Sequence, residues 1–535
     1  MSFIRGSAQP GVHATVNAAV IGAPAPAESS DALFAVIYSP WGPVNVARSL
    51  AGLADLTRQF GGLHANSHGV AALHNFFRQG GRIAQVVRVV GPAAAVATVT
   101  LVDRAGAPVN TLRVDARYPS SSVDVRVRVE AGTEPNTVRI TARSLKLGAA
   151  APLEIFDNFK LTFTQDELDA INAGQSRLID VAGVNSRSSL IRLADLASGT
   201  AAPNNLPALS AVLEGVVQET VLAGGSDDFA GITAATFIGT DDGLDRTGLQ
   251  VFNTEDFGTG QVALPGVTTQ AAHAALLAHA ERFKRFALLD PAFGSDRDAV
   301  AAARALLGSS YGAIHWPWVL QPDLEGTGTT KFYPPSGFVA GICARADFET
   351  GIHKTPANYV VLGAVGVELA ANGSSQTDDA SHAFLNQREV NVIKTIREQG
   401  VKVYGARCLA SFGRVTAIHQ QRVLNRIYYD LLRSYQEIPF AVLDAEGRLF
   451  REVKSIGEQY LSELYRGGAL TSPTGDERDA YVVICDESNN PAASLDQHQV
   501  NVSVGVHIVG MAEMVFVDIN SVPLATSLGV LRREQ

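Results

Sequence analysis

Two hydrophobic periodicities follow one another along this chain, and their order restricts the folds it can adopt. Between residues 96 and 200, apolar residues recur at every second position. The pattern is clearest from Val123 to Val129, where charged residues stand between the valines. Such alternation is typical of a half-buried antiparallel strand. Outside this stretch, apolar runs alternate with segments of helical spacing, which indicates an α/β layer. The sequence therefore predicts a β-rich domain inserted into, or following, an α/β layer.

The α/β layer is predicted from segments on both sides of the β-rich stretch. Leu33 to Tyr38 and Ile83 to Val90 have the composition of buried strands, with helical spacing between them. From about residue 205 the same alternation returns, and we expect helices at 271–286 and 296–307. The fold class expected is therefore α/β and α+β, multidomain. We assign residues 31–94 and 205–395 to the α/β core and residues 95–204 to the β-rich domain.

Residues 396–520 predict a further domain of two helices on an antiparallel sheet. Apolar residues at helical spacing place its helices at 418–435 and 449–465. Val500 to Ile508 follows a strict period of two, which favours a strand. With further strands expected at 480–485 and 513–519, the simplest architecture is two helices over a three-stranded sheet.

The two ends of the chain lack the periodicity of a packed element. Residues 1–30 are rich in Ala, Gly, Pro and Ser, and residues 521–535 are apolar but short. We interpret 1–30 as an N-terminal extended arm with a linker, and 521–535 as a C-terminal extended arm.

Charge and composition narrow the classes of function. With 46% apolar residues, 18% charged residues and a net charge of −10, the chain is predicted to be globular and a poor general binder of nucleic acid. No secretory signal and no long uninterrupted apolar run is evident, so we expect no membrane insertion and a product that stays in the cytosol of the cell that makes it.

Motifs that carry catalysis or bind cofactors are not found in the sequence. It lacks the GxSxG elbow, the phosphate loop and a dinucleotide fingerprint. The acidic run Asp241–Asp245 lacks the spaced ligands of a calcium loop, and we interpret it as a solvated turn. His64 and His68 are four residues apart, but nearby glycines favour a loop over a zinc site. The three cysteines, Cys343, Cys408 and Cys485, are expected to be buried thiols. We expect no catalytic residue, cofactor or metal.

Three stretches between residues 280 and 510 share an order and spacing with one known family. They are Phe286–Pro291 with Tyr311–Val319; Pro334–Arg345 with Gly351–Asn358; and Asn391–Ile393 with Val403–Arg407, Glu458–Leu470 and Cys485–Glu487. In these stretches the chain resembles the contractile tail sheath proteins of phage tails and phage-derived injection systems. The combination of Pro334–Gly337 with Gly351–Asn358 is the most specific part. We interpret the Pro, Gly and Asn residues as fixing turns that set a surface facing another subunit.

The resemblance implies a structural subunit and not an enzyme. Such subunits polymerise helically around a tail tube in a metastable extended state, then contract to drive the tube through a cell envelope. The expected partners are further copies joined through exchanged terminal strands, the tail tube protein, and baseplate and tail terminator proteins. The expected place is the virion tail or injection particle, assembled in the host cytoplasm, with 95–204 as a variable outer domain. A baseplate or other virion protein and an α/β hydrolase are the alternatives.

One basic helix is a candidate surface for the tube. Between residues 402 and 433 the chain carries six Lys or Arg residues against one acid, although the whole chain is acidic. On the helix expected at 418–435, Arg422, Arg426 and Arg433 share one face because four and seven residues return a side chain to nearly the same direction. The resemblance implies that this domain lies innermost. We therefore expect these three arginines to face an acidic strip of the tube protein.

Overall fold

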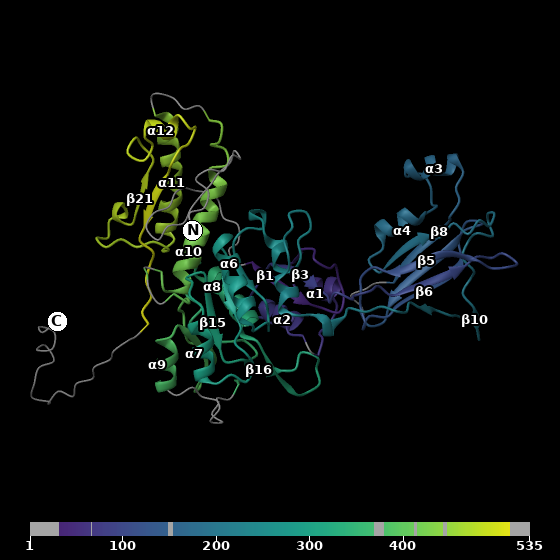
Figure 1. Cartoon of the computed structure of the whole chain (residues 1–535), viewed down its shortest axis with the longest axis horizontal. Coiled ribbons are helices and arrows are strands. Elements are labelled where there is room, and N and C mark those ends of the chain that lie inside the picture. Colours follow the sequence, from purple (N-terminus) through teal and green to yellow (C-terminus); the bar gives the residue numbers. More distant parts are fainter. Residues whose placement is uncertain are drawn as a thin grey trace, which may run out of the picture.

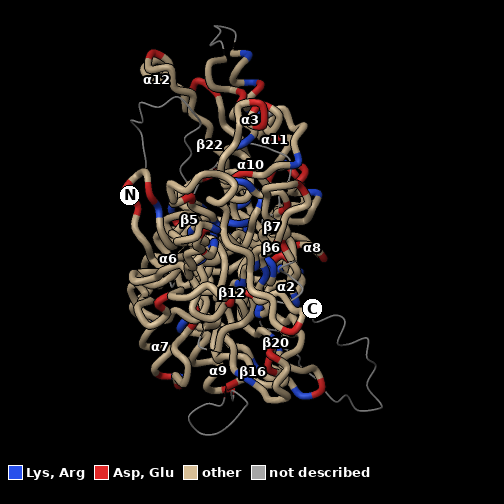
Figure 2. The backbone as a smooth tube through the Cα atoms, turned by 90° about the vertical axis from the view of Figure 1, so that its right-hand side faces the viewer, with Lys and Arg blue, Asp and Glu red and all other residues tan. Residues whose placement is uncertain are grey.

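The computed structural model describes residues 32–65, 67–147, 153–368, 379–410, 413, 415–441 and 447–513. A central α/β body carries a β-rich unit at one end and a C-terminal unit of long helices at the other (Figure 1). Viewed from the side of the β-rich unit, its strands lie in front of the body, and acidic and basic residues are interspersed along the tube (Figure 2). The α/β and α+β multidomain class is confirmed.

The α/β body is built on a sheet with the order β2-β3-β1-β13-β14-β15-β19-β20. Its central strands pair in parallel, and the edge strands β2 and β20 run antiparallel to their neighbours. Strands of a parallel sheet are buried on both faces, which explains the continuous apolar runs in the sequence. The strands are β1 (Leu33–Tyr38), β2 (Arg48–Leu50), β3 (Ala84–Val89), β13 (Gln261–Ala263), β14 (Phe286–Leu289), β15 (Gly312–Trp316), β19 (Val390–Ile396) and β20 (Gly400–Val403).

Helices cover both faces of this sheet and close two hydrophobic cores. One core lies under α1 (Leu53–Phe60), α2 (Gly69–Gln79) and α8 (Pro335–Glu349). The other lies under α5 (Ala234–Ile238), α6 (Gln270–Arg282), α7 (Arg297–Ala305) and α9 (Asp379–Asn386), together with the short helices η3 (Gly248–Phe252) and η4 (Glu255–Phe257). A small sheet of β16 (Val319–Pro322), β17 (Thr330–Tyr333) and β18 (Gly366–Val367) extends the body.

Helix α8 shows that the motif Pro334–Gly337 has an internal role. Pro335 occupies the first turn of the helix, where its missing N–H costs nothing. Ser336 is buried and donates to Asp290, whereas Gly337 faces α2, where a Cβ on it would lie 2.4 Å from the carbonyl oxygen of Ala72. Our interpretation of this part of the motif as a subunit-facing turn was wrong, because these residues begin a buried helix and Gly337 lets it pack closely on α2 of the same chain.

The β-rich unit has a core of its own between two sheets. One sheet has the order β4-β5-β9 and the other β12-β6-β7-β8. The unit reaches Ser226, which bridges Ala95, so the predicted end at residue 204 falls short. Its elements are β4 (Thr98–Val102), β5 (Asn110–Ala116), β6 (Val125–Ala131), β7 (Val138–Ser144), β8 (Glu154–Phe159), α3 (Gln165–Asn172), α4 (Val181–Arg187), β9 (Ile191–Asp195), β10 (Val212–Leu213), β11 (Val216–Val217), β12 (Thr220–Val221) and the following helix η2 (Phe229–Gly231).

The C-terminal unit contains α10 (Ile418–Ser434), α11 (Arg448–Arg466), η5 (Glu477–Asp479), β21 (Tyr481–Ile484), α12 (Ala492–Leu495) and β22 (Ser503–Val506). It begins near residue 417 and not at 396, because β20 belongs to the α/β sheet. Within the residues described, its sheet has only the two strands β21 and β22, which pair antiparallel. The strand expected at 513–519 falls almost wholly outside the described residues. The expected arms at 1–30 and 521–535 lie outside them entirely.

Candidate assembly surfaces

In α/β enzymes with a parallel sheet, the substrate binds at the carboxyl ends of the strands. The site lies at the topological switch point, where the connections from two neighbouring strands run in opposite directions. In this sheet that point lies between β1 and β13. It is filled by side chains of the same chain: His68 packs edge-on against Trp318, with ring centroids 4.8 Å apart, and also touches the Gly266 position. The buried Asp290 carboxylate accepts hydrogen bonds from Gly266 N and from Ser336 N and Oγ. Burial raises the pKa of Asp290 to about 6. These groups are used in holding loops and the start of α8.

The histidines and cysteines singled out in the sequence are used in packing. His64 lies at a bridge with Ser67, and His68 precedes α2, so this segment is a loop as predicted. The three cysteines are buried and free, also as predicted. Across the described residues, no group of three His, Cys, Asp or Glu side chains is placed to hold a metal ion.

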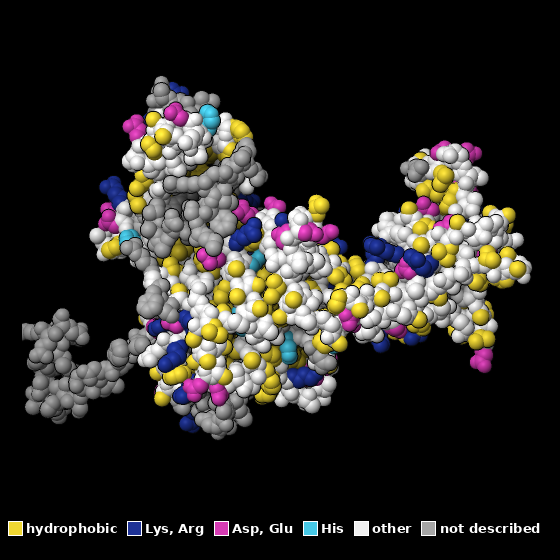
Figure 3. Space-filling view, viewed as in Figure 1, with side chains coloured by type: hydrophobic (Ala, Val, Ile, Leu, Met, Phe, Trp, Pro, Cys, Tyr) yellow, Lys and Arg dark blue, Asp and Glu magenta, His cyan; other side chains and the backbone are white. Residues whose placement is uncertain are grey.

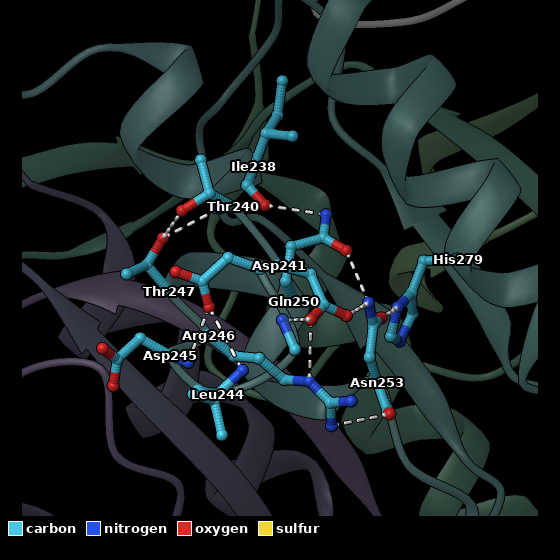
Figure 4. A network of polar contacts seen from close by, with 12 residues as sticks. Ile238, Thr240, Asp241, Leu244, Asp245, Arg246, Thr247, Gln250, Asn253 and His279 are labelled. Atoms are coloured by element: carbon cyan, nitrogen blue, oxygen red, sulfur yellow. Dashed lines mark hydrogen bonds and ion pairs between the residues drawn. The ribbon is translucent and has the colours of Figure 1, made fainter.

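The acidic run at 241–245 forms an exposed turn held by its own hydrogen bonds (Figure 4). Asp241 accepts from Arg246 Nε at 3.1 Å, Asn253 Nδ2 at 2.9 Å and Gly243 N at 3.1 Å. These bonds lower the pKa of Asp241, with Asn253 contributing most. Asn253 in turn bonds to the buried His279, which anchors the turn to α6. The carboxylate is committed to shaping the turn, which agrees with the solvated turn we expected.

Helix α10 lies between two layers, and this placement decides what its arginines do. Its apolar face, with Leu424, Ile427 and Leu431, packs into the core of the C-terminal unit, as predicted. Another face meets the α/β body, where Asn425 Nδ2 donates to Arg285 O at 3.0 Å. The helix therefore joins the two units and is not a solvated outer helix.

Arg422 is the clearest correction to the expected tube-facing set. Its side chain is 3% exposed and forms an ion pair with Asp347 of α8. Arg426 is also largely buried and pairs with Asp430, whose carboxylate accepts a second hydrogen bond from Tyr460 at 2.8 Å. Burial raises the pKa of Asp430, and these contacts oppose that rise. Of the three arginines, Arg433 alone is exposed. The shared helix face is real, but the chain itself covers most of it.

A groove lies beside the sheet of the C-terminal unit. Its volume is about 520 Å³. It is lined by Lys454 and Glu458 of α11, by Asp476, Glu477 and Arg478 around η5, and by Tyr481, Val482 and Val483 of β21.

The backbone of β21 has an edge that no described strand occupies. Ala480 O accepts from His507 N, and antiparallel pairs alternate, so Val482 and Ile484 bond toward β22. By the same alternation the N–H groups of Tyr481 and Val483 point to the opposite edge. Val483 is buried against the helices, so the strand is held in place on one face. Sequence reasoning missed this groove because it assigned a third strand to the sheet.

Charged side chains on the face in Figure 3 lie in small groups between broad apolar and neutral areas. Over the residues described, no helix has the length and apolarity required to cross a bilayer.

Comparison with known proteins shows which proteins this chain is similar to. A family model for the central domain of phage tail sheath proteins matches residues 249–409, from η3 to just beyond β20. A curated protein of Pseudomonas aeruginosa strain UCBPP-PA14, described as a prophage major tail sheath protein, is 26% identical over 200 residues. That match covers 36% of this chain and 50% of the relative, so the chain spans about half the length of the curated relative.

Solved structures extend the likeness to nearly the whole chain. The sheath tail protein of Listeria innocua has a TM-score of 0.57 at 15% identity, covering 87% of this chain and 90% of that one. The helical sheath of the anti-feeding prophage in its contracted state has a TM-score of 0.53 at 16% identity, covering 97% and 99%. A chain of the anti-feeding prophage baseplate has a TM-score of 0.52 at 16% identity, covering 97% and 100%.

These findings define a class first by fold: the chain has the architecture of contractile sheath subunits. Residues 249–409 match the central domain of phage tail sheath proteins, and the resemblance to the contractile tail sheath family is confirmed.

Proposed function

We propose that this protein is the structural subunit of a contractile tail sheath. It polymerises helically around a tail tube in a metastable extended state, and contraction drives the tube through the envelope of a target cell. The sheath fold and the family match over 249–409 support this function. Contraction of such an assembly is a rigid-body repacking of subunits, which requires neither nucleotide nor metal.

The observation that carries the proposal is the open edge of β21 beside its groove. An isolated two-stranded sheet is marginally stable, and an extended segment that adds to its edge supplies the missing backbone hydrogen bonds. The terminal segments 1–30 and 521–535 have the composition for such a role. Neighbouring copies are therefore linked by exchanged strands, and contacts of this head-to-tail kind propagate without closing.

The other partners follow from this role. The sheath surrounds the tail tube protein and ends at baseplate and tail terminator proteins, within a virion tail or injection particle assembled in the host cytoplasm. The subunit makes no direct contact with nucleic acid, does not insert into a membrane and catalyses no reaction. The side chains that fill the point between β1 and β13 support this structural role, because a doubly wound enzyme keeps that place open for its substrate.

The tube-facing surface is proposed in a revised form. The C-terminal unit faces the tube, and Arg433 is the arginine of the original set that is exposed for an acidic partner. Arg422 and Arg426 hold intramolecular ion pairs and stabilise the unit from within. An exposed pair is worth roughly 1 kcal/mol or less, so docking depends on repetition over many subunits.

Electron microscopy of the purified protein tests the proposal. Long helical tubes are the expected result. Discs or small rings would instead favour a baseplate component, since the fold is also similar to that of a baseplate chain. Particles that remain single at every concentration would contradict the sheath function.

A further inference from the structure

A second surface of the α/β body combines cations with exposed apolar groups, and it is distant in sequence from the β21 groove. We call it the basic face. It consists of Arg78 and Arg82 at the end of α2, Arg345 and Phe348 at the end of α8, Lys354 and Tyr359–Leu362 in the following loop, and Lys402 of β20.

Contacts between side chains join these residues into one continuous surface. The Arg82 guanidinium lies 3.6 Å from the centroid of the Phe348 ring. Arg345 Nη2 donates to Val360 O at 2.7 Å, and the Arg345 guanidinium lies 5.2 Å from the Tyr359 ring. At the far side, Lys402 Nζ donates to Asn358 Oδ1 at 3.0 Å, next to Tyr359. The end of α2, the end of α8 with the loop after it, and β20 therefore present one surface.

The basic face carries five cations, and Glu349 at the end of α8 is the acid beside them. None of the ion pairs in the described residues involves Arg78, Arg82, Arg345, Lys354 or Lys402. Arg345 Nε is buried without a hydrogen-bond partner. Glu349 is the acid that acts on Arg345. In a chain with a net charge of −10, such a concentration of unpaired cations is a surface suited to an acidic, partly apolar partner.

The chain carries a segment with the complementary chemistry. In the turn Asp241–Asp245, the side chain of Leu244 is 96% exposed and stands between Asp242 and Asp245. Asp241 is paired with Arg246, so Asp242 and Asp245 supply the net negative charge of the turn. Asp242 Oδ1 also accepts from Leu244 N and Asp245 N, which holds the leucine outward between the carboxylates.

The two surfaces lie over opposite faces of the α/β sheet. The basic face belongs to α2 and α8, over one core, whereas the turn projects between α5 and η3, over the other core. They are separated within one molecule by the sheet and its helices. A contact between them therefore joins two molecules. Because it uses two different patches, it is heterologous and repeats along a polymer.

We propose that the turn Asp241–Asp245 of one copy docks on the basic face of the next copy, with Leu244 against the apolar part of that face and Asp242 and Asp245 beside its cations. The inference rests on the proposed self-assembly, and it adds a second intersubunit contact that is independent of strand exchange. Being electrostatic and exposed, this contact weakens as salt is added.

The test is a charge swap measured on the full chain. The variant Arg78→Glu, Arg82→Glu, Lys354→Glu is expected to raise the critical concentration for tube assembly about tenfold or more, because several exposed pairs become repulsive. The variant Asp242→Lys, Asp245→Lys should have a similar effect. Combining all five substitutions in one chain should restore assembly, because the attraction is re-formed with opposite signs.

A matched control separates this contact from the effect of net charge. Arg177, Arg187 and Arg192 are exposed on the β-rich unit, and changing all three to Glu alters the net charge equally without touching either surface. This control should assemble as the wild type does. Thermal unfolding checks that each variant is folded.

Two failures have different meanings. Suppose the wild type forms tubes. If either charge-reversal variant then assembles normally, or the variant with all five substitutions does not regain assembly, the docking is wrong and the sheath function stands. If the wild type forms no tubes, the proposed function fails. Sedimentation equilibrium at low salt then still tests the docking. The docking predicts self-association of the wild type, which each charge reversal removes and the combined variant restores. Absence of self-association in the wild type would overturn it.

Discussion

Two buried arginines of this chain, Arg88 and Arg422, lie at the junctions between its units. Arg88 has no exposed area and donates to Ser39 O, Gly42 O and Pro119 O, which ties the loop after β1 to the β-rich unit. Burial lowers the pKa of Arg88 to about 10. Arg422 and Asp347 form the corresponding junction between α10 and α8. A buried charge that loses its partner is costly, so each junction holds one geometry.

Arg422 gives a prediction that separates an internal from a tube-facing role. The substitution Arg422→Ala is expected to destabilise the folded chain by about 3–5 kcal/mol, because it leaves the Asp347 carboxylate buried without its cation. Denaturant unfolding followed by helical circular dichroism measures the loss. Adding Asp347→Leu should recover part of the stability, since no unpaired charge then remains. Full stability of Arg422→Ala alone would show that the ion pair does not hold the junction.

His315 predicts how stability depends on pH. It lies buried on β15, neither ring nitrogen has a hydrogen-bond partner in the described structure, and burial lowers its pKa to about 3. The unfolded chain takes up a proton near pH 6.5, whereas the folded chain resists it down to about 3. Its contribution is therefore fully present above pH 6.5 and is lost as the pH falls toward 3.

The size of this effect follows from the separation of the two pKa values. At pH 4, His315 should cost the folded state about 3 kcal/mol relative to its contribution at pH 7. Between pH 7 and pH 4, the unfolding free energy of a His315→Leu variant should therefore fall by about 3 kcal/mol less than that of the wild type. Parallel pH profiles of the two proteins, measured by denaturant unfolding, would contradict the assignment.

At the scale of elements, periodicity predicted which longer segments form strands and helices, but not which parts of the chain those elements contact. Leu33–Tyr38 was expected as a strand and is one, and the helix expected at 418–435 ends at Ser434. The strands β10 to β12 have two residues each and leave no pattern, so the β-rich unit was ended too early. Helical spacing placed Arg422 on a face with Arg426, but its partner is 75 residues away. Such a contact depends on tertiary packing, and so does the groove beside β21.

The edge of β21 predicts a difference between two substitutions at Tyr481. Tyr481→Pro removes the N–H that points to the open edge, at the first position of a strand where proline is tolerated. Tyr481→Ala removes the same side chain, which donates to Glu477 Oε1 at 2.9 Å, but keeps the N–H. The proline variant should need about fivefold more protein to form tubes than the alanine variant, equivalent to about 1 kcal/mol for one lost hydrogen bond.

Equal critical concentrations for the two Tyr481 variants would mean that no strand adds to this edge. Electron microscopy over a dilution series provides the measurement, and the melting temperature of each variant confirms that the C-terminal unit remains folded.

At the scale of the whole molecule, three units with separate cores are joined by buried polar contacts (Figure 1). Such a subunit can keep its internal structure while its contacts with other copies change, which is the mechanical requirement for contraction. Strand exchange would keep neighbours linked during that change, because an extended connection tolerates rotation of the units that it joins.

Deletion of residues 1–20 is the most direct test of this central claim. The four described cores all lie outside the deleted segment, so the truncated protein should remain folded and soluble, with unchanged circular dichroism. Under conditions in which the full chain forms helical tubes, electron microscopy should show that the truncated chain forms none. Ordered tubes from the truncated protein, at the same concentration and salt, would contradict linkage through the N-terminal arm.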